Sequence, residues 1–319
     1  MDEATLRMIR HLRHDLGPTV SAYLDNALCE DIALNADGRL WVKLLRQPWT
    51  AVGMMTPDEA LKVASALARL KGDVINSANP VLETVLPGDG SRIEVVVPPM
   101  SSSPIFSIRT RAKQIYSLDQ YVQDGILSDL HAALIKGAIA SSKTILVSGA
   151  TGSGKTTFLN ACLKELARIG DSIRVGLLED TPELQYPGTH CVQLLSPLAP
   201  EGLMDSMLRT LQVALRLRLD RIIVGEVRDR AALTMLKAYN TGSPGGLTTI
   251  HANSAKAALL RLESLVHEAI PNYKAEDLIR EAIQIVVHID GPTPHSNRKV
   301  REVCGMNFEA KGGYKLVAL

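Results

Sequence analysis

The chain has 319 residues, 46% of them hydrophobic, which is enough for two domains with buried cores. Its net charge of +1 and aromatic content of 4% argue against a surface built for nucleic acid, so we expect no direct sequence-specific contact with DNA or RNA. Four cysteines form no C-x-x-C pair, which excludes a tetracysteine zinc site and a disulfide framework and fits the reducing cytoplasm.

The N-terminal segment predicts an amphipathic helix. Leu6, Ile9, Leu12 and Leu16 recur near helical spacing, with arginines between them. A solvated helix of the domain explains this pattern, and so does a helix lying on an anionic membrane surface. The segment has no apolar core of the signal-peptide kind, and no run in the chain approaches the ~18–20 apolar residues that span a bilayer.

The rest of the first third indicates a small α+β domain, residues 1–111. The Asp-Gly pair at 37–38 lies between two apolar runs and predicts a hairpin. Thr56 and Glu59 form the pattern of a helix capping box, with proline at the first helical position. The segments SRIEVVVPP and PIFSIRTR predict strands.

The remainder predicts an α/β domain after a linker. Residues 112–127 show no clear periodicity, and we interpret them as the linker. A helix is expected from Ser128. Four short apolar strands (TILVS, IRVGLL, RIIVG and LTTI) then alternate with helices, and a helix, a strand and a hairpin follow. This alternation predicts a parallel sheet covered by helices over residues 128–319.

The segment GATGSGKTT matches the phosphate-binding pattern G-x-x-x-x-G-K-T between a predicted strand and a predicted helix. Backbone N–H groups of such a loop face phosphate oxygens, Lys155 places a charge near the outer phosphates, and Thr156 offers an oxygen to Mg²⁺. The sequence therefore predicts a site for ATP and Mg²⁺. Its residues are Gly149, Ala150, Thr151, Gly152, Ser153, Gly154, Lys155, Thr156 and Thr157.

Two acidic clusters follow predicted strands. Glu179, Asp180 and Glu183 follow IRVGLL, and Glu226 follows RIIVG. An acidic turn often only caps a helix. Because parallel strands end at one edge of a sheet, both clusters should also approach the nucleotide, where carboxylates hold Mg²⁺ and orient water. His251 follows LTTI, where it is either structural or able to sense the terminal phosphate, and the spacing leaves both open.

Taken together, GATGSGKTT, LEDTPELQ, VGEVRD, GGLTTIHANS and ALLRLESL resemble the secretion (traffic) ATPases of type II and type IV secretion, pili and conjugation. The resemblance extends to CEDIALNADGRLWV, LPGDGSRIE and FSIRTRA, so it covers nearly the whole chain in order. The short chain is most similar to the conjugal-transfer TrbB type.

The resemblance implies a PAS-like N-terminal domain, a RecA-like C-terminal domain and nucleotide between them. It also implies a homohexameric ring at the cytoplasmic face of the inner membrane. The ring would work with inner-membrane components of the secretion machine, and peripheral contact with the membrane itself stays an open possibility. ATP hydrolysis then drives pilus or apparatus assembly and substrate transfer.

The same resemblance implies roles for the residues. Glu183 is the catalytic carboxylate, although Pro182 restricts its turn and leaves Glu179 as an alternative base. Glu226 and His251 match the Walker B and His boxes. The metal-binding set is Thr156, Glu226, Glu179 and Asp180.

Arginines complete the implied site. Arg109 and Arg111 of the N-terminal domain would reach the phosphates. Arg228 and the run Arg216, Arg218 and Arg221 are either phosphate or inter-subunit contacts or a solvated helix face.

Two other functions stay open at this point. A RecA-like helicase would need a basic channel bearing aromatic residues, which this composition disfavours. A scaffold gated by ATP binding, with negligible turnover, is compatible with the same motifs, although the filled acidic positions favour hydrolysis.

Overall fold

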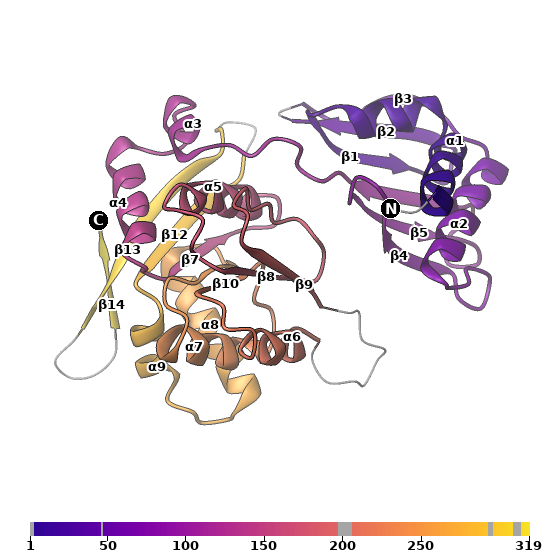
Figure 1. Ribbon diagram of the computed structural model, residues 1–319. Helices are drawn as coiled ribbons and strands as arrows, with labels where there is room; N and C mark the ends of the chain where they lie inside the picture. The colour runs from indigo at the N-terminus through magenta and orange to yellow at the C-terminus, as the bar shows by residue number, and fades with distance from the viewer. Residues whose placement is uncertain (1–2, 46, 197–205, 293–295, 309–313) are drawn as a thin grey trace. The chain divides into compact units, whose positions relative to one another are not determined.

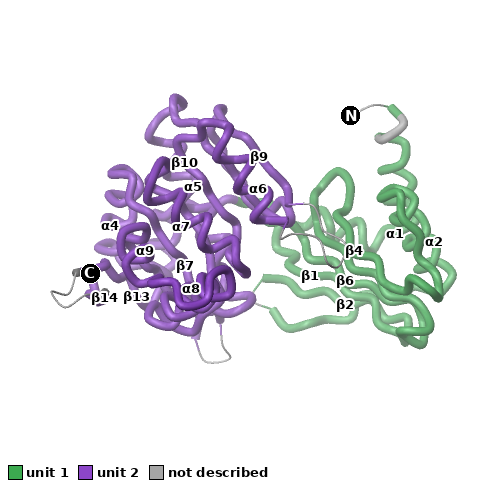
Figure 2. The backbone as a smooth tube through the Cα atoms, turned by 90° about the horizontal axis from the view of Figure 1, so that it is seen from below, with its two compact units in different colours: residues 1–114 green, residues 115–319 purple. Residues whose placement is uncertain are grey.

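The computed structural model describes residues 3–45, 47–196, 206–292, 296–308 and 314–319. The chain divides into two compact units, residues 1–114 and 115–319 (Figures 1 and 2). Each unit has its own sheet and hydrophobic core. Within the described part of the chain, no helix combines the length and the apolar character that crossing a bilayer requires.

Unit 1 is an antiparallel sheet in the order β3-β2-β1-β6-β5-β4, with two helices that share its core. It is the PAS-like α+β domain expected from the sequence. Its elements are α1 (Glu3–Asp25), β1 (Cys29–Leu34), β2 (Arg39–Leu44), β3 (Thr50–Met54), α2 (Pro57–Lys71), β4 (Val81–Val85), β5 (Arg92–Val96) and β6 (Ile105–Arg109).

Local sequence signals explain two of these elements. The Asp-Gly pair turns β1 into β2, and Gly38 adopts a φ of 80°, which glycine accepts without strain. At the start of α2, Thr56 Oγ1 accepts a 3.3 Å hydrogen bond from the Glu59 amide, and Glu59 Oε2 accepts a 2.8 Å bond from the Thr56 amide. Both features are as predicted.

Helix α1 consists of two helical pieces that meet at Gly17, where φ is 78°. Leu12 and Leu16 are buried in the core of unit 1. Leu6 and Met8 are 43% and 44% exposed. The predicted apolar stripe therefore serves the core of the domain from Leu12 onward, and only the first turns present apolar side chains outward.

Unit 2 contains a sheet in the order β14-β13-β12-β7-β11-β10-β8-β9, parallel from β12 to β9 and antiparallel from β12 to β14. Its strands are β7 (Ile145–Gly149), β8 (Val175–Glu179), β9 (Cys191–Leu195), β10 (Arg221–Val224), β11 (Leu247–His251), β12 (Ile285–Asp290), β13 (Lys299–Phe308) and β14 (Tyr314–Ala318). This is the predicted RecA-like parallel sheet with a hairpin at its end.

Helices cover both faces of this sheet (Figure 1). One face carries α3 (Leu118–Gln123), α4 (Asp129–Ala140) and α5 (Lys155–Ala167). The other carries α6 (Ser206–Ala214), α7 (Ala231–Thr241), α8 (Ala255–Ala269) and α9 (Ala275–Ala282). The central strands β7, β8, β10 and β11 are therefore buried on both sides, apart from His251 at the end of β11. This burial explains why they read as short continuous apolar runs.

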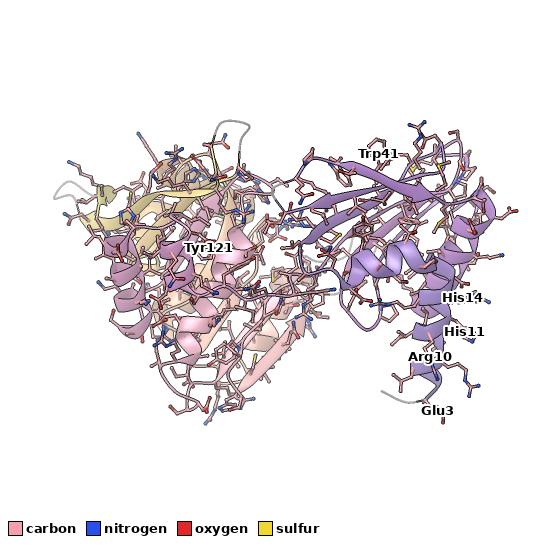
Figure 3. All side chains as sticks on the ribbon, turned by 90° about the horizontal axis from the view of Figure 1, so that it is seen from above. Glu3, Arg10, His11, His14, Trp41 and Tyr121 are labelled. Carbon is pink, nitrogen blue, oxygen red and sulfur yellow. The ribbon has the colours of Figure 1, made fainter. Side chains whose placement is uncertain are left out.

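The structure differs from the expected linker at 112–127. From residue 115 onward the chain belongs to unit 2 and includes helix α3. Ser117 and Gln120 close a capping box at its start, through bonds of 3.1 and 2.7 Å. Leu118 and Tyr121 are 1% and 3% exposed, and Tyr121 lies within unit 2 (Figure 3). A six-residue helix is too short to show a period, which is why the sequence read as irregular.

Candidate active site

The phosphate loop lies between the end of β7 and the start of α5. Gly152 and Gly154 have φ values of 75° and 94°, a region that favours glycine. A Cβ atom at Gly149 would lie 2.4 Å from Ser153 Oγ and 2.5 Å from the Ile289 carbonyl oxygen. The three loop glycines are therefore required by backbone conformation or by close packing.

Lys155, the first residue of α5, is buried within the loop. Its Nζ donates hydrogen bonds of 3.1 Å to the carbonyl oxygens of Gly149 and Ala150. The same Nζ lies 3.1 Å from His251 Nδ1. The ammonium group is therefore held at the positive end of α5, beside the last residue of a neighbouring strand.

His251 connects the loop to an acidic residue. Its Nε2 lies 2.9 Å from Glu226 Oε1, and its Nδ1 lies 3.5 Å from Thr151 Oγ1. Burial lowers the pKa of His251, Lys155 and Arg228 lower it further, and Glu226 opposes them. A neutral ring that accepts a hydrogen bond from Lys155 Nζ at Nδ1 carries its proton on Nε2, which directs that N–H toward Glu226.

Glu226 follows β10 through Gly225. Its Oε2 accepts a 2.8 Å hydrogen bond from Arg228 Nη2, whose pKa is raised chiefly by this bond. Arg228 Nη1 lies 3.9 Å from Asp180 Oδ2. The other Glu226 oxygen, Oε1, is buried, and within the described part of the chain its contact is the 2.9 Å approach of His251 Nε2. The site thus holds a carboxylate oxygen with capacity for another ligand.

Glu179, the last residue of β8, is 3% exposed and its two oxygens are occupied. Oε1 accepts the amides of Glu183 and Leu184 at 2.9 and 2.6 Å, and Oε2 accepts Gln193 Nε2 at 3.1 Å. Burial raises the pKa of Glu179, and these three hydrogen bonds oppose the rise. The geometry therefore favours an anchoring role for Glu179 over a metal-binding or basic one.

The turn that carries Glu183 is held on a second side by Asn160 of α5. Asn160 Nδ2 donates 3.1 Å to the Glu183 carbonyl oxygen, and Asn160 Oδ1 accepts 2.9 Å from the Gln185 amide. The Glu183 side chain is half-buried. Sequence reasoning missed Asn160 and Gln193. The signal that the sequence offers for Asn160 is a polar residue within the apolar helix stretch FLNACL, and the structure shows that this residue is 3% exposed.

The remaining loop residues lie at the start of α5. Thr156 and Thr157 are half-buried in its first turn, and Ser153 is buried with no hydrogen bond to its Oγ. The N-cap residue, Gly154, provides no side-chain acceptor for the first amides of the helix. These donors suit phosphate oxygens.

The residues fit ATP with Mg²⁺. The buried Ser153 Oγ, which has no hydrogen-bond partner in the described part of the chain, and the uncapped α5 amides supply donors. Thr156 and Glu226 Oε1, whose contact is with His251 Nε2, supply oxygens to a cation. Among the described residues, no group of three His, Cys, Asp or Glu side chains could hold a metal ion by itself. Mg²⁺ would therefore be bound through one or two protein oxygens together with phosphates and water, as is usual for this ion.

The predicted arginines divide into three groups. Arg228 is part of the site. Arg221 is buried and donates to the carbonyl oxygens of Gly245 and Ile139 and to Ser142 Oγ, so its role is structural. Arg216 and Arg218 are exposed beyond α6.

Arg109 and Arg111 belong to unit 1, at and just after the end of β6. Arg109 lies opposite Asp31 in the sheet, and the Arg111 amide donates 3.2 Å to Ser91 Oγ. Contact of either arginine with nucleotide stays a prediction.

The comparisons with known proteins agree with this fold. Residues 21–309 match the family model described as type II/IV secretion system protein. Conjugal transfer protein TrbB of Rhizobium radiobacter is 42% identical over 93% of this chain and 90% of its own length. Type IV secretion system protein VirB11 of Bartonella quintana is 29% identical, over 78% of this chain and 80% of that protein.

Among solved structures, the Legionella pneumophila ATPase DotB superposes with a TM-score of 0.64 and 20% identity, covering 94% of this chain and 79% of DotB. At that identity the likeness concerns the fold. The family match spans most of the sequence, and the TrbB relative is similar along nearly all of it. The chain therefore belongs to the type II/IV secretion system protein family.

Proposed function

We propose that the chain is an ATP-hydrolysing motor of a conjugation or type IV secretion system. One observation carries the proposal: Lys155, His251 and Glu226 form a continuous contact chain from the phosphate loop to the acidic end of β10. A lysine on the phosphates and a carboxylate beside it are what Mg²⁺-assisted phosphoryl transfer to water requires. The similarity to proteins named for conjugal transfer and type IV secretion supports the biological setting.

The proposed roles follow from the contacts. Lys155 moves from the loop carbonyls to the β- and γ-phosphates, and Thr156 and Glu226 hold Mg²⁺, which neutralises phosphate charge when bound. Glu183, with Asp180 nearby, orients the attacking water. Glu179 keeps the Glu183 turn in place. Neutral His251 donates a hydrogen bond from its Nε2 N–H to an oxygen of the terminal phosphate or to Glu226.

The assembly is proposed to be a homohexameric ring at the cytoplasmic face of the inner membrane. Unit 1 closes over the nucleotide on unit 2, with Arg109 and Arg111 as candidate phosphate contacts, and hydrolysis releases the closure. The segment around 112–114 is then the hinge. The partners of the ring are inner-membrane components of the secretion machine. Leu6 and Met8, which are exposed, are the candidates for membrane contact.

Steady-state ATP hydrolysis tests the proposal. Wild type should hydrolyse ATP in a Mg²⁺-dependent manner, with activity per subunit that rises with protein concentration. Lys155→Ala and Glu183→Gln should each reduce turnover by about 10²-fold or more, while Glu183→Gln still binds ATP. Wild type that binds ATP but shows no turnover above the Lys155→Ala background, at any concentration, would favour a nucleotide-gated scaffold instead.

A further inference from the structure

Arg298, just before β13, lies against the phosphate loop. A Cβ atom built at Gly154 would be 2.6 Å from Arg298 Nε and 2.7 Å from its Cζ, so the guanidinium packs directly on the backbone at the start of α5. Nothing in the local sequence SNRKV marks this residue, because its neighbour Gly154 is distant along the chain. The contact depends on the tertiary fold.

Arg298 approaches the loop on the side away from the candidate catalytic groups. β7 pairs with β11 on one side, where His251 aligns with Gly149. On its other side β7 pairs with β12, whose chain leads through Gly291 to Arg298. A Cβ at Gly291 would lie 3.2 Å from Ser153 Cα, so Gly291, just after β12, borders the loop directly.

No residue that the structure describes offers a partner for the charge of Arg298. Among the described residues, none forms a hydrogen bond or ion pair with Arg298, and its Nε is buried. Tyr121, which is 3% exposed and interacts electrostatically with Arg298, also has a hydroxyl with no hydrogen-bond partner among the described residues. A cation beside Lys155 and the positive end of α5 is electrostatically unfavourable unless an anion joins them.

We propose that Arg298 binds the phosphates of the nucleotide nearest the nucleoside, the α- and β-phosphates. This rests on the proposed function, because the γ-phosphate must face Glu226 and His251 on the β11 side. The phosphates that remain lie toward the β12 side, where Arg298 and the unpaired Ser153 Oγ are close to Gly154. Arg298 is thus a positioning residue for the nucleotide, present in both the ATP and the ADP complex.

Nucleotide affinity tests this assignment. Arg298→Ala should weaken ATP and ADP binding by a similar factor of about 10–100, the range for one charge-assisted contact. Arg298→Lys should recover part of the loss and Arg298→Gln should not, because the contact depends on charge. Lys299→Ala removes an exposed charge one residue along the chain and is the matched control, with unchanged affinity.

Thermal unfolding separates this role from a structural one. Without nucleotide, Arg298→Ala should melt at the wild-type temperature or above it, since it relieves repulsion at the end of α5, while the ADP-induced rise in melting temperature should shrink. A lower melting temperature without nucleotide together with unchanged ADP affinity would overturn the inference. So would a loss confined to ATP, or affinity retained in Arg298→Gln. Wild type that binds neither nucleotide would instead refute the proposed function.

Discussion

Replacing Glu179 by alanine should loosen the turn that carries Glu183. The substitution removes three hydrogen bonds, from the amides of Glu183 and Leu184 and from Gln193 Nε2. At a net value of about 1 kcal/mol for each bond, the loss is about 3 kcal/mol in the free energy of unfolding of unit 2. Burial of the carboxylate destabilises wild type and raises the pKa of Glu179. Alanine removes this desolvation cost, so the net loss in the free energy of unfolding is smaller than the sum of the hydrogen bonds.

Urea unfolding followed by circular dichroism measures the effect, with the unit 2 transition analysed separately if the two units unfold apart. Asp180→Ala is the control. Asp180 has an ion-pair contact of 3.9 Å to Arg228 and is partly exposed, so its loss should change stability by about 0.5 kcal/mol or less. Glu183→Gln should keep wild-type stability and lose turnover. Wild-type stability in Glu179→Ala, combined with turnover as low as in Glu183→Gln, would refute the anchoring role and make Glu179 the base.

Two other variants test the site in three ways. Gly149→Ala should lower stability by about 1–3 kcal/mol in the same urea assay, because its Cβ would meet Ser153 Oγ and the Ile289 carbonyl oxygen; a neutral substitution contradicts the loop packing. His251→Gln should lower the hydrolysis rate about 10- to 100-fold while ADP affinity is retained, and equal losses of ATP and ADP affinity would place His251 away from the γ-phosphate. The pKa of folded His251 is below its ordinary value of 6.5, so the unfolded chain binds the proton first as the pH falls. The stability that neutral His251 contributes is therefore lost as the pH falls below about 6.5. Between pH 7.5 and 5.5, the free energy of unfolding measured in urea should fall less in His251→Gln than in wild type. The same pH dependence in both proteins would contradict the lowered pKa.

Elements with local signals were predictable from the sequence. The phosphate loop, the Asp-Gly hairpin, the Thr56 capping box and the helix from Ser128 each depend on residues within a few positions of one another. Such signals act before any tertiary contact forms. The four parallel strands β7, β8, β10 and β11 were also predictable, because burial on both faces demands continuous apolar runs.

Elements that depend on contacts with distant parts of the same chain were not predictable. Strand β9 has alternating burial and no continuous apolar run, since it is the edge of the sheet. Helix α3 was hidden because its six residues cover fewer than two turns. In each case the deciding contacts lie in other parts of the chain.

The same division applies to the site. The sequence placed Lys155, Glu226 and His251 at neighbouring strand ends, and the sheet order brings them into contact. The sequence did not distinguish the role of Glu179 from that of Glu183, because the two carboxylates lie four residues apart in one acidic turn. Their roles diverge only through Asn160, 23 residues from Glu183, and through Gln193 on the adjacent strand.

Mixing of active and inactive subunits tests the central claim of a ring motor most directly. Lys155→Ala protein would be mixed with wild type at a fixed total concentration, with subunit exchange verified by native mass spectrometry of a mass-tagged variant, and ATP hydrolysis would be measured against the fraction of wild type. The account predicts an activity that falls more steeply than that fraction, because each ring needs several working sites in sequence. A linear decrease in fully exchanged samples would mean that the subunits hydrolyse ATP independently and would contradict the motor.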